Sequence, residues 1–352
     1  MQKIRLSVFG LLCCSLFEML HAQEQRDFQL VTIAFYNLEN LFDTENDLIT
    51  FDDDRTPDGK DHWTAEIYAD KLTKMAEVLR QIGTDETRDS PAVIGVAEIE
   101  NRKVLEALVT QKSLKPYDYG IVHYDSPDRR GVDVGLLYRK SVFKPISSKA
   151  FELPLFDPEE NNKRLYTRDQ LLVTGDLAGE RVHILVNHWP SRSGGEKRTQ
   201  PRREAAAALN RKIIDSILSV EPYAKIISMG DLNDDPKDAS LKKVLKTKGK
   251  IKQTGLLDLF NPMEDLAKQG AGSLAYRDSW NLFDQIYFTE SLVNNKNKEY
   301  QFWKAGIFNP AYLVTQKGRY KGYPFRTYSG GNYTGGYSDH FPVYIYLLRK
   351  PE

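Results

Sequence analysis

Eight short apolar segments, spread along 352 residues, restrict the fold of this chain more than any other feature. They are rich in β-branched and aromatic residues and lie between turn signals, a pattern that is typical of β-strands. The predicted strands are residues 30–36, 92–98, 132–138, 170–176, 182–188, 225–229, 283–288 and 342–347.

Two longer segments repeat apolar residues with the period of a helix. In residues 65–82 the apolar positions fall at i, i+3, i+7 and i+10, and in residues 202–220 they fall at i, i+3, i+7 and i+11. Several strands, such as residues 181–186, alternate apolar with polar side chains, so each would bury one face. Strands of this kind together with amphipathic helices predict one α/β domain in which two packed sheets are covered by helices.

The first 22 residues have the pattern of a cleavable export signal. Lys3 and Arg5 precede an apolar run at residues 6–20, which is shorter than the roughly 20 residues of a membrane span. We therefore expect residues 1–22 to be removed and residues 23–352 to form a single catalytic domain. The mature protein is expected to be periplasmic or extracellular.

Composition limits what the chain can bind. The 49 basic and 49 acidic residues balance, so no overall charge attracts DNA or an anionic membrane, and a polyanion would need a local patch. The two cysteines, Cys13 and Cys14, would leave with the signal, and the leucines before them do not fit a lipid-attachment site. A large core or a bound metal must then stabilise a chain without disulfides. We expect a monomer with no obligate protein partner.

Polar side chains follow the predicted strands at the points where they end. The first strand runs into Asn37, and the second ends at Glu98 after five small or apolar residues. Such a carboxylate would lie at the rim of a buried strand, although a helix cap or a surface acid is the alternative. His188 ends another strand, where a structural imidazole is the alternative.

A basic segment follows His188. Five basic residues between Arg192 and Arg203 lie within 15 residues of it, and Trp189 is adjacent. Guanidinium groups donate two parallel hydrogen bonds to phosphate oxygens, so this segment suits a phosphate ester. The start of a solvated helix would show the same charges.

Two more motifs supply carboxylates and amides. Asp231 and Asn233 follow the strand at residues 225–229, and they could aim two side chains at one point or simply cap a turn. The pair Asp339-His340 precedes the last strand, and Asp284 is the candidate carboxylate to hold its imidazole. A turn residue that faces solvent is the alternative for Asp284.

The candidate ligands are oxygen-rich and include no cysteine, which favours Mg²⁺ or Mn²⁺ over Zn²⁺. The chain has no His-Glu-x-x-His zinc motif, no Gly-x-Ser-x-Gly nucleophile elbow and no Gly-x-x-x-x-Gly-Lys phosphate loop. These absences argue against a zinc hydrolase, a serine hydrolase and a P-loop NTPase.

The order of these motifs resembles the endonuclease/exonuclease/phosphatase superfamily from about residue 30 to 348. The resemblance implies a four-layer α/β sandwich, with two packed mixed β-sheets flanked by helices. Residues 37–43 and 187–192 are similar to an exported bacterial branch of the superfamily. The residues that carry the resemblance are Asn37, Glu98, His188, Asp231, Asn233, Asp284, Asp339 and His340.

The resemblance also implies roles. Glu98 would be the principal metal ligand, with Asn37 and Asp339 close to the metal. Asp231 would activate or position the attacking water, with Asn233 beside it.

The histidines would act on the substrate. His188 and His340 would bind the scissile phosphate, and Asp284 would orient His340. Arg168 resembles a phosphate-contacting arginine of several branches. Tyr138 falls where some members have an active-site tyrosine, although a core tyrosine explains it equally well. Arg192 and Trp189 complete the predicted substrate contacts.

In-line attack by water on phosphorus is the reaction that this set implies. We predict an exported phosphoester hydrolase that depends on Mg²⁺ or Mn²⁺ and acts on nucleic acid as a nuclease. A phosphatase or phosphodiesterase for small or lipid-linked phosphates is the alternative, because the acidic segment at residues 43–61 would repel a long polyanion. An inactive binding module on the same scaffold is a remote third reading, since no catalytic group is missing.

Overall fold

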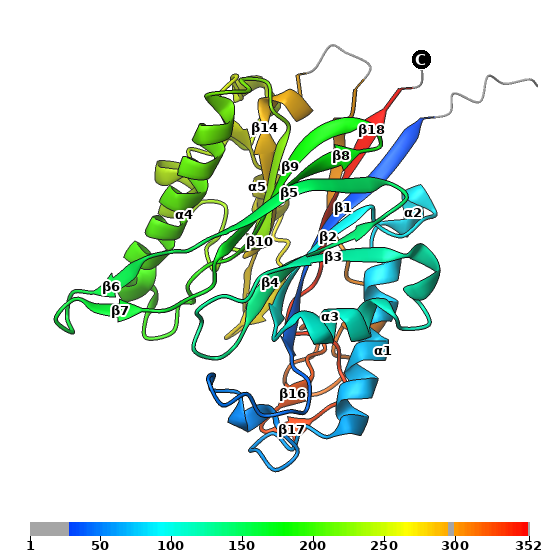
Figure 1. Ribbon diagram of the computed structural model, residues 1–352, viewed down its shortest axis with the longest axis vertical. Helices are drawn as coiled ribbons and strands as arrows, with labels where there is room; N and C mark the ends of the chain where they lie inside the picture. Colours follow the sequence, from blue (N-terminus) through cyan, green and yellow to red (C-terminus); the bar gives the residue numbers. More distant parts are fainter. Residues whose placement is uncertain (1–27, 295–298, 351–352) are drawn as a thin grey trace, which may run out of the picture.

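The computed structural model describes residues 28–294 and 299–350, and it contains two six-stranded sheets (Figure 1). The first has the order β15 (Gln301–Ile307), β18 (Val343–Arg349), β1 (Gln29–Leu41), β2 (Val93–Ile99), β4 (Asp133–Arg139), β3 (Tyr119–His123). The second has the order β11 (Leu259–Phe260), β14 (Asp284–Thr289), β10 (Ile226–Asp231), β9 (Glu180–His188), β8 (Gln170–Leu177), β5 (Phe143–Phe151).

Helices cover the outer faces of both sheets. On one side lie α1 (Ala65–Gln81) and α3 (Arg102–Val109), and on the other lies α4 (Glu196–Leu218) (Figure 1). The short helices are α2 (Thr84–Thr87) and α5 (Met263–Lys268). Three hairpins complete the described chain: β6 (Leu155–Asp157) with β7 (Lys163–Leu165), β12 (Leu274–Tyr276) with β13 (Ser279–Asn281), and β16 (Tyr328–Ser329) with β17 (Asn332–Tyr333).

The predicted four-layer α/β sandwich is confirmed, and alternation along the strands explains it. In β1, Ile33 and Phe35 point into the core between the sheets, whereas Ala34 and Tyr36 pack under α1. In β10, Ile227 contributes to the core between the sheets. A strand with period two therefore serves two layers at once. Hydrophobic residues on both faces of each sheet explain why the central strands have few polar positions.

Glycine permits the close approach of the two sheets. A β-carbon added at Gly95 would lie 2.6 Å from the sulfur of Met229 in the facing sheet. No side chain fits there without displacing that core residue. The glycine before Glu98 is thus explained by packing between the layers.

Each sheet contains one parallel pair at its centre, and the rest of its pairs are antiparallel. The parallel pairs are β1 with β2 and β9 with β10. A parallel pair needs a crossover, and here α1 and α4 supply it. The carboxyl ends of all four strands consequently lie at one edge of the sandwich.

All eight predicted strands are present, and so are both predicted helices. The helix predicted at residues 202–220 begins earlier, at Glu196, so that Pro201 lies in its second turn. Among the described residues no helix is long and apolar enough to cross a membrane. The predicted export signal at residues 1–22 lies outside the residues that the structure describes and stays a prediction.

The acidic segment at residues 43–61 contacts Glu100, which lies just past β2 and is buried. Its carboxyl accepts a hydrogen bond of 2.6 Å from the backbone N–H of Asp43. Burial, together with the nearby carboxylates of Asp43, Asp52 and Asp47, raises the pKa of Glu100 to about 8, against the lowering effect of that N–H. The segment is therefore partly folded into the domain.

This raised pKa predicts a pH-dependent stability. In the unfolded chain a glutamate ionises near pH ~4.3, so between that value and about 8 the folded state binds more protons at Glu100. The free energy of unfolding should thus fall as pH rises through this window. Glu100→Gln, which stays neutral, should have a higher Tm than the wild type at pH 9 and a similar Tm at pH 4. Glu45→Gln, at an exposed position nearby, is the control. If the Tm difference between Glu100→Gln and the wild type is the same at pH 4 and at pH 9, the expectation is contradicted.

Candidate active site

Four strand ends bring the predicted catalytic residues together. Asp231 ends β10, where it pairs with His188 of β9 on one side and with Asp284 of β14 on the other. In the facing sheet, Asn37 of β1 pairs with Ala97 of β2, next to Glu98. The parallel pairs of both sheets thus point their carboxyl ends at the same edge.

The centre of the site joins the two sheets through side chains. The Nδ2 group of Asn37 donates to Oε1 of Glu98 over 3.2 Å and to Oδ2 of Asp231 over 3.1 Å. The Nε2 atom of His188 lies 3.8 Å from Oε1 of Glu98 and 3.6 Å from Oδ2 of Asp231. Residues that are up to 194 positions apart therefore surround one point.

The backbone is held in unfavourable conformations at this point. Glu98, Asn40 and Asn233 have φ of 58°, 55° and 50°, in the left-handed region that costs a residue with a β-carbon about 1 kcal/mol or more. The register of β2 shifts between Ala97 and Ile99, so Glu98 forms a bulge. The N–H of Asn40 then donates to Oε2 of Glu98 over 3.1 Å. Strain of this kind at one spot is typical of a functional site.

Asp284 and His340 form the predicted pair. Oδ2 of Asp284 lies 2.6 Å from Nδ1 of His340, and Asp284 is fully buried. Burial alone would lower the pKa of His340, but the carboxylates of Asp284, Asp231 and Asp339 outweigh it and raise this pKa well above its usual value. His340 is therefore an imidazolium, with Nε2 3.9 Å from Oδ2 of Asp231.

His188 differs from His340 in charge. Burial and the positive charges of Arg168, Arg130 and His340 lower the pKa of His188 well below its usual value. Its Nδ1 atom is buried and has no hydrogen-bond partner among the described residues. We expected both histidines to offer positive donors, and in this arrangement only His340 is held in its charged form.

Asp231 is poised between two protonation states. Burial raises its pKa to about 7, the imidazolium of His340 lowers it, and the carboxylates of Asp284 and Glu98 raise it again. The N–H of Asn233 donates to Oδ1 of Asp231 over 3.0 Å and fixes the carboxyl group. Asn233 itself is held by its Nδ2, which donates to the carbonyl of Trp189 over 3.1 Å.

The donor set fits a divalent cation. One ligand atom from each of Glu98, His188 and Asp231 lies within 4.8 Å of the others. Two carboxylates this close in a buried place repel each other, and a bound cation would relieve that repulsion. Oxygen atoms dominate the set, as hard cations require. In this arrangement Asn37 presents its amide nitrogen to both carboxylates, because its Oδ1 accepts the N–H of Glu39 over 2.9 Å.

Asp339 lies beside this group and contacts residues that the sequence did not indicate. Its Oδ1 lies 3.9 Å from Nε2 of His340, while its Oδ2 lies 3.0 Å from the guanidinium of Arg326. Arg326 also contacts the buried Glu39 at 3.0 Å. Glu39 could have been found from its place two residues after Asn37, but nothing local singles out Arg326.

Arg168 and Trp189 are placed as supports of the site. Arg168 is buried and donates to the carbonyl oxygens of His188 over 3.1 Å and of Trp189 over 2.6 Å, and it pairs with Asp128 at 2.9 Å. Trp189 is only 1% exposed, so it has no free face for a substrate. In this conformation the side chains of both residues are occupied by contacts within the protein. They hold the end of β9.

Four of the five cations in the predicted basic patch pair with acids from other segments. Arg192 pairs with Asp238 at 2.6 Å and with Asp234 at 3.2 Å, and its guanidinium packs over the ring of Phe283 at 4.5 Å. Further pairs join Arg198 to Glu159, Arg202 to Asp157 and Arg203 to Asp234. A phosphate contact of Arg192 stays a prediction, and the structure shows its guanidinium paired with acids.

Tyr138 lies far from the site. It pairs with Val93 at the start of β2 and packs against Phe143, whereas Glu98 lies at the other end of β2. At about 3.3 Å per residue, five residues of strand separate them by roughly 16 Å. The structure therefore places Tyr138 at the opposite end of β2 from Glu98, packed against Phe143 as the alternative of a core tyrosine describes.

A match to known proteins agrees with this geometry. The model of the "Endonuclease/Exonuclease/phosphatase family" matches residues 32–349. The search of curated proteins found no match.

Solved structures with the same fold include TDP2 from D. rerio complexed with a single-strand DNA product (16% identity, 91% of this chain and 99% of that chain, TM-score 0.51). They also include truncated TDP2 from Caenorhabditis elegans (16% identity, 91% of this chain and 97% of that chain, TM-score 0.54). A third is an endonuclease/exonuclease/phosphatase family protein from Bacteroides thetaiotaomicron (18% identity, 92% of this chain and 100% of that chain, TM-score 0.53). At these identities the likeness concerns the fold. The family model covers nearly the whole described chain, and this chain therefore belongs to the endonuclease/exonuclease/phosphatase family.

Proposed function

We propose that this protein is a metal-dependent phosphodiesterase that cleaves nucleic acid. The observation that carries the proposal is a group of carboxylates beside a buried imidazolium. Glu98, His188 and Asp231 bring ligand atoms within 4.8 Å of one another. The imidazolium of His340, which is held by Asp284, has its Nε2 atom 3.9 Å from Oδ2 of Asp231. A phosphate needs both a cation and a fixed hydrogen-bond donor, and this edge of the sandwich offers a place for each.

The side chains support an in-line attack by water. Asp231, whose buried carboxyl lies beside Glu98 and His340, is suited to accept a proton from the attacking water or to orient it. His340 would donate a charged hydrogen bond to a phosphate oxygen, and Asp284 keeps it oriented and protonated. A divalent cation held by Glu98 and its neighbours would supply the remaining neutralisation of the phosphate and of the leaving oxygen.

Nucleic acid is the substrate class that we favour. A fold neighbour, TDP2 from D. rerio, was solved with a single-strand DNA product, which supports a nucleic acid for this chain. The pairing of the four arginines of residues 192–203 with acids favours the second candidate, a small or lipid-linked phosphate ester. We also propose Mg²⁺ or Mn²⁺ as the cation, a monomeric state, and export by the signal at residues 1–22 as in the exported bacterial branch.

Hydrolysis should require the metal. Dialysis against EDTA is expected to abolish release of 4-nitrophenol from bis(4-nitrophenyl) phosphate, and Mg²⁺ or Mn²⁺ should restore it, because the ligands are mostly oxygen donors. Glu98→Gln should not recover at the metal concentration that restores the wild type. A parallel screen with plasmid DNA, RNA, nucleotides, inositol phosphates and phospholipids assigns the substrate. Undiminished turnover after chelation would contradict the metal requirement.

A further inference from the structure

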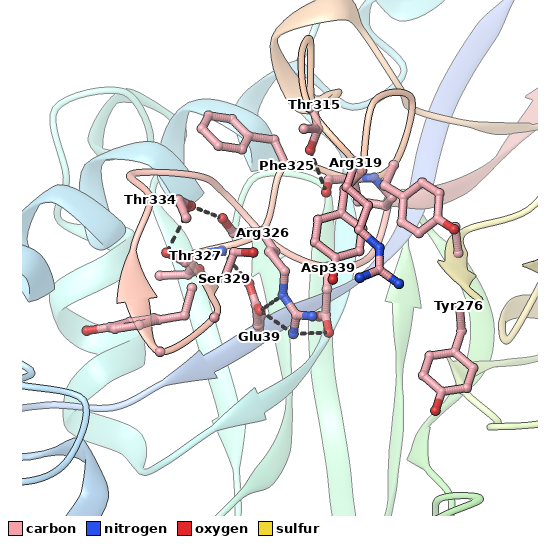
Figure 2. Close-up of a pocket in the computed structure, with 18 of the residues that line it drawn as sticks. Glu39, Tyr276, Thr315, Arg319, Phe325, Arg326, Thr327, Ser329, Thr334 and Asp339 are labelled. Atoms are coloured by element: carbon pink, nitrogen blue, oxygen red, sulfur yellow. Dashed lines mark hydrogen bonds and ion pairs between the residues drawn. The ribbon is translucent and has the colours of Figure 1, made fainter. Parts of the chain in front are cut away.

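A large pocket adjoins the catalytic edge. Its volume is about 940 Å³, and it shares Glu39, Asn40 and Asp339 with the surroundings of the site. Its walls come from three segments that are far apart in the sequence, residues 55–63, 275–278 and 315–334 (Figure 2). None of them contributes to the catalytic group, so the pocket is placed to hold a part of the substrate beside the reacting phosphate.

The acids of this pocket are all engaged. Asp61 pairs with Arg55 at 2.5 Å, and Asp278 accepts a hydrogen bond of 2.6 Å from the hydroxyl of Tyr323. The two acids nearest the catalytic edge, Glu39 and Asp339, share the guanidinium of Arg326 (Figure 2). The negative charges of the pocket are therefore balanced or hydrogen-bonded within it.

Four cations of the pocket have no such partner. Among the described residues, no carboxylate lies within 4.0 Å of the charged groups of Lys60, Arg277, Lys317 and Arg319, and all four side chains are exposed. The lining of the pocket holds six cations and four acids, so its balance of charge is positive. It therefore suits an anion with several charges.

Exposed aromatic rings accompany two of these cations. The guanidinium of Arg277 lies 5.2 Å from the ring centre of Tyr276, and that of Arg319 lies 5.7 Å from the ring centre of Tyr320. Tyr276 is 63% exposed and Tyr320 is 46% exposed, so each ring keeps a surface for a ligand. Rings interleaved with arginines provide stacking platforms for bases and donors for the phosphates between them.

We propose that this pocket binds the nucleotides that adjoin the scissile phosphate of a single-stranded nucleic acid. Phosphates would contact Arg277, Lys317 and Arg319, and bases would stack on Tyr276 and Tyr320. The inference rests on the proposed function and adds the direction in which the nucleic-acid strand leaves the site. The strand leaves the site across residues 315–334 and not across residues 192–203, whose four arginines are paired with acids.

Paired substitutions test the charges. Arg277→Ala with Arg319→Ala removes two unpaired cations, and Lys197→Ala with Arg198→Ala removes two exposed cations on the segment at residues 192–203 as a matched control. We expect the first pair to raise KM for a single-stranded oligonucleotide by at least tenfold. For this double variant, the slope of the logarithm of the binding constant against the logarithm of the salt concentration should be less steep than for the wild type by about 1.4. This value corresponds to roughly 0.7 for each lost phosphate contact. Turnover of bis(4-nitrophenyl) phosphate should stay within twofold for both pairs.

A second pair separates bases from phosphates. Tyr276→Ala with Tyr320→Ala should weaken binding of the oligonucleotide several-fold without changing its salt dependence, and should leave binding of an abasic oligonucleotide unchanged. Circular dichroism and Tm show that each variant is folded.

The outcomes distinguish the two proposals. If the wild type fails to hydrolyse bis(4-nitrophenyl) phosphate with added metal, the proposed function fails. If it does hydrolyse this ester, the pocket assignment is overturned by any of three results: no oligonucleotide binding, an unchanged KM in Arg277→Ala with Arg319→Ala, or an equal rise in the matched control.

Discussion

Alanine at His188 or at Asp231 is expected to lower kcat for phosphodiester hydrolysis by roughly 10²–10³-fold, since each removes a group that acts mainly in the transition state. Steady-state kinetics with bis(4-nitrophenyl) phosphate at saturating metal measures the effect. Arg198→Ala, at an exposed position in a surface ion pair, should keep the wild-type rate. A variant that retains more than about a tenth of the wild-type rate would mean that its role is misassigned.

Stability separates a catalytic loss at Asp231 from misfolding. Its pKa of about 7 is raised, so in the metal-free protein this carboxyl destabilises the fold progressively as pH rises from about 4 through 7. Asp231→Asn removes the buried charge and keeps the shape. We therefore expect the asparagine variant to lose activity while its Tm at pH 8 without metal equals or exceeds that of the wild type.

Asp284 and His340 are expected to behave as one unit. His340→Ala removes the imidazolium, and Asp284→Asn removes the carboxylate that keeps it charged, so each should reduce kcat strongly. The double variant should be scarcely slower than His340→Ala alone, because the second substitution removes an interaction that is already lost. A double-mutant cycle on kcat gives the coupling.

The control cycle combines Asp284→Asn with Arg198→Ala, two positions with no shared partner in the structure. Those effects should add. If the losses from Asp284→Asn and His340→Ala also add, the two residues work independently and the contact has no catalytic role.

The strands that the sequence predicts are the eight interior strands of the two sheets, and the strands that it misses are the four at the edges. Interior strands are packed on both faces and paired on both sides, so they need continuous apolar residues. The missed strand β5 is largely exposed, and β11 has only two residues. An edge strand is not packed on both faces and is not paired on both sides, so its sequence keeps turn-like and polar residues. Periodicity therefore identifies the centre of each sheet and not its borders.

The residues of the site also divide into those that the sequence could locate and those that it could not. Strand ends indicated Glu98, His188 and Asp231, because a polar residue after an apolar run must emerge at a rim. Tyr138 lies away from this group for a related reason. It ends β4, which runs antiparallel to β2, so the carboxyl end of β4 lies at the opposite edge. A sequence pattern locates a strand end but does not give the direction of the strand.

Charged residues could not be assigned from local sequence. Arg192 seemed free for a phosphate, but its partner Asp238 lies 46 residues away. The unpaired cations of the pocket belong to three separate segments, and only their folded arrangement shows which of them lack acids. Net charge within a short window says little about whether a cation is available.

The pairing of β1 with β18 has a consequence for synthesis. Gln29 lies opposite Arg349, 320 residues later, and His340 precedes β18 directly. Such long-range pairing closes slowly, because the entropy of joining distant segments is lost before their contacts form. A nascent chain that has emerged only as far as residue 337 carries Glu98, His188 and Asp231 but lacks the imidazolium. The group of Glu98, His188, Asp231 and His340 can therefore be assembled only after residues 338–349 have emerged and β18 has paired with β1.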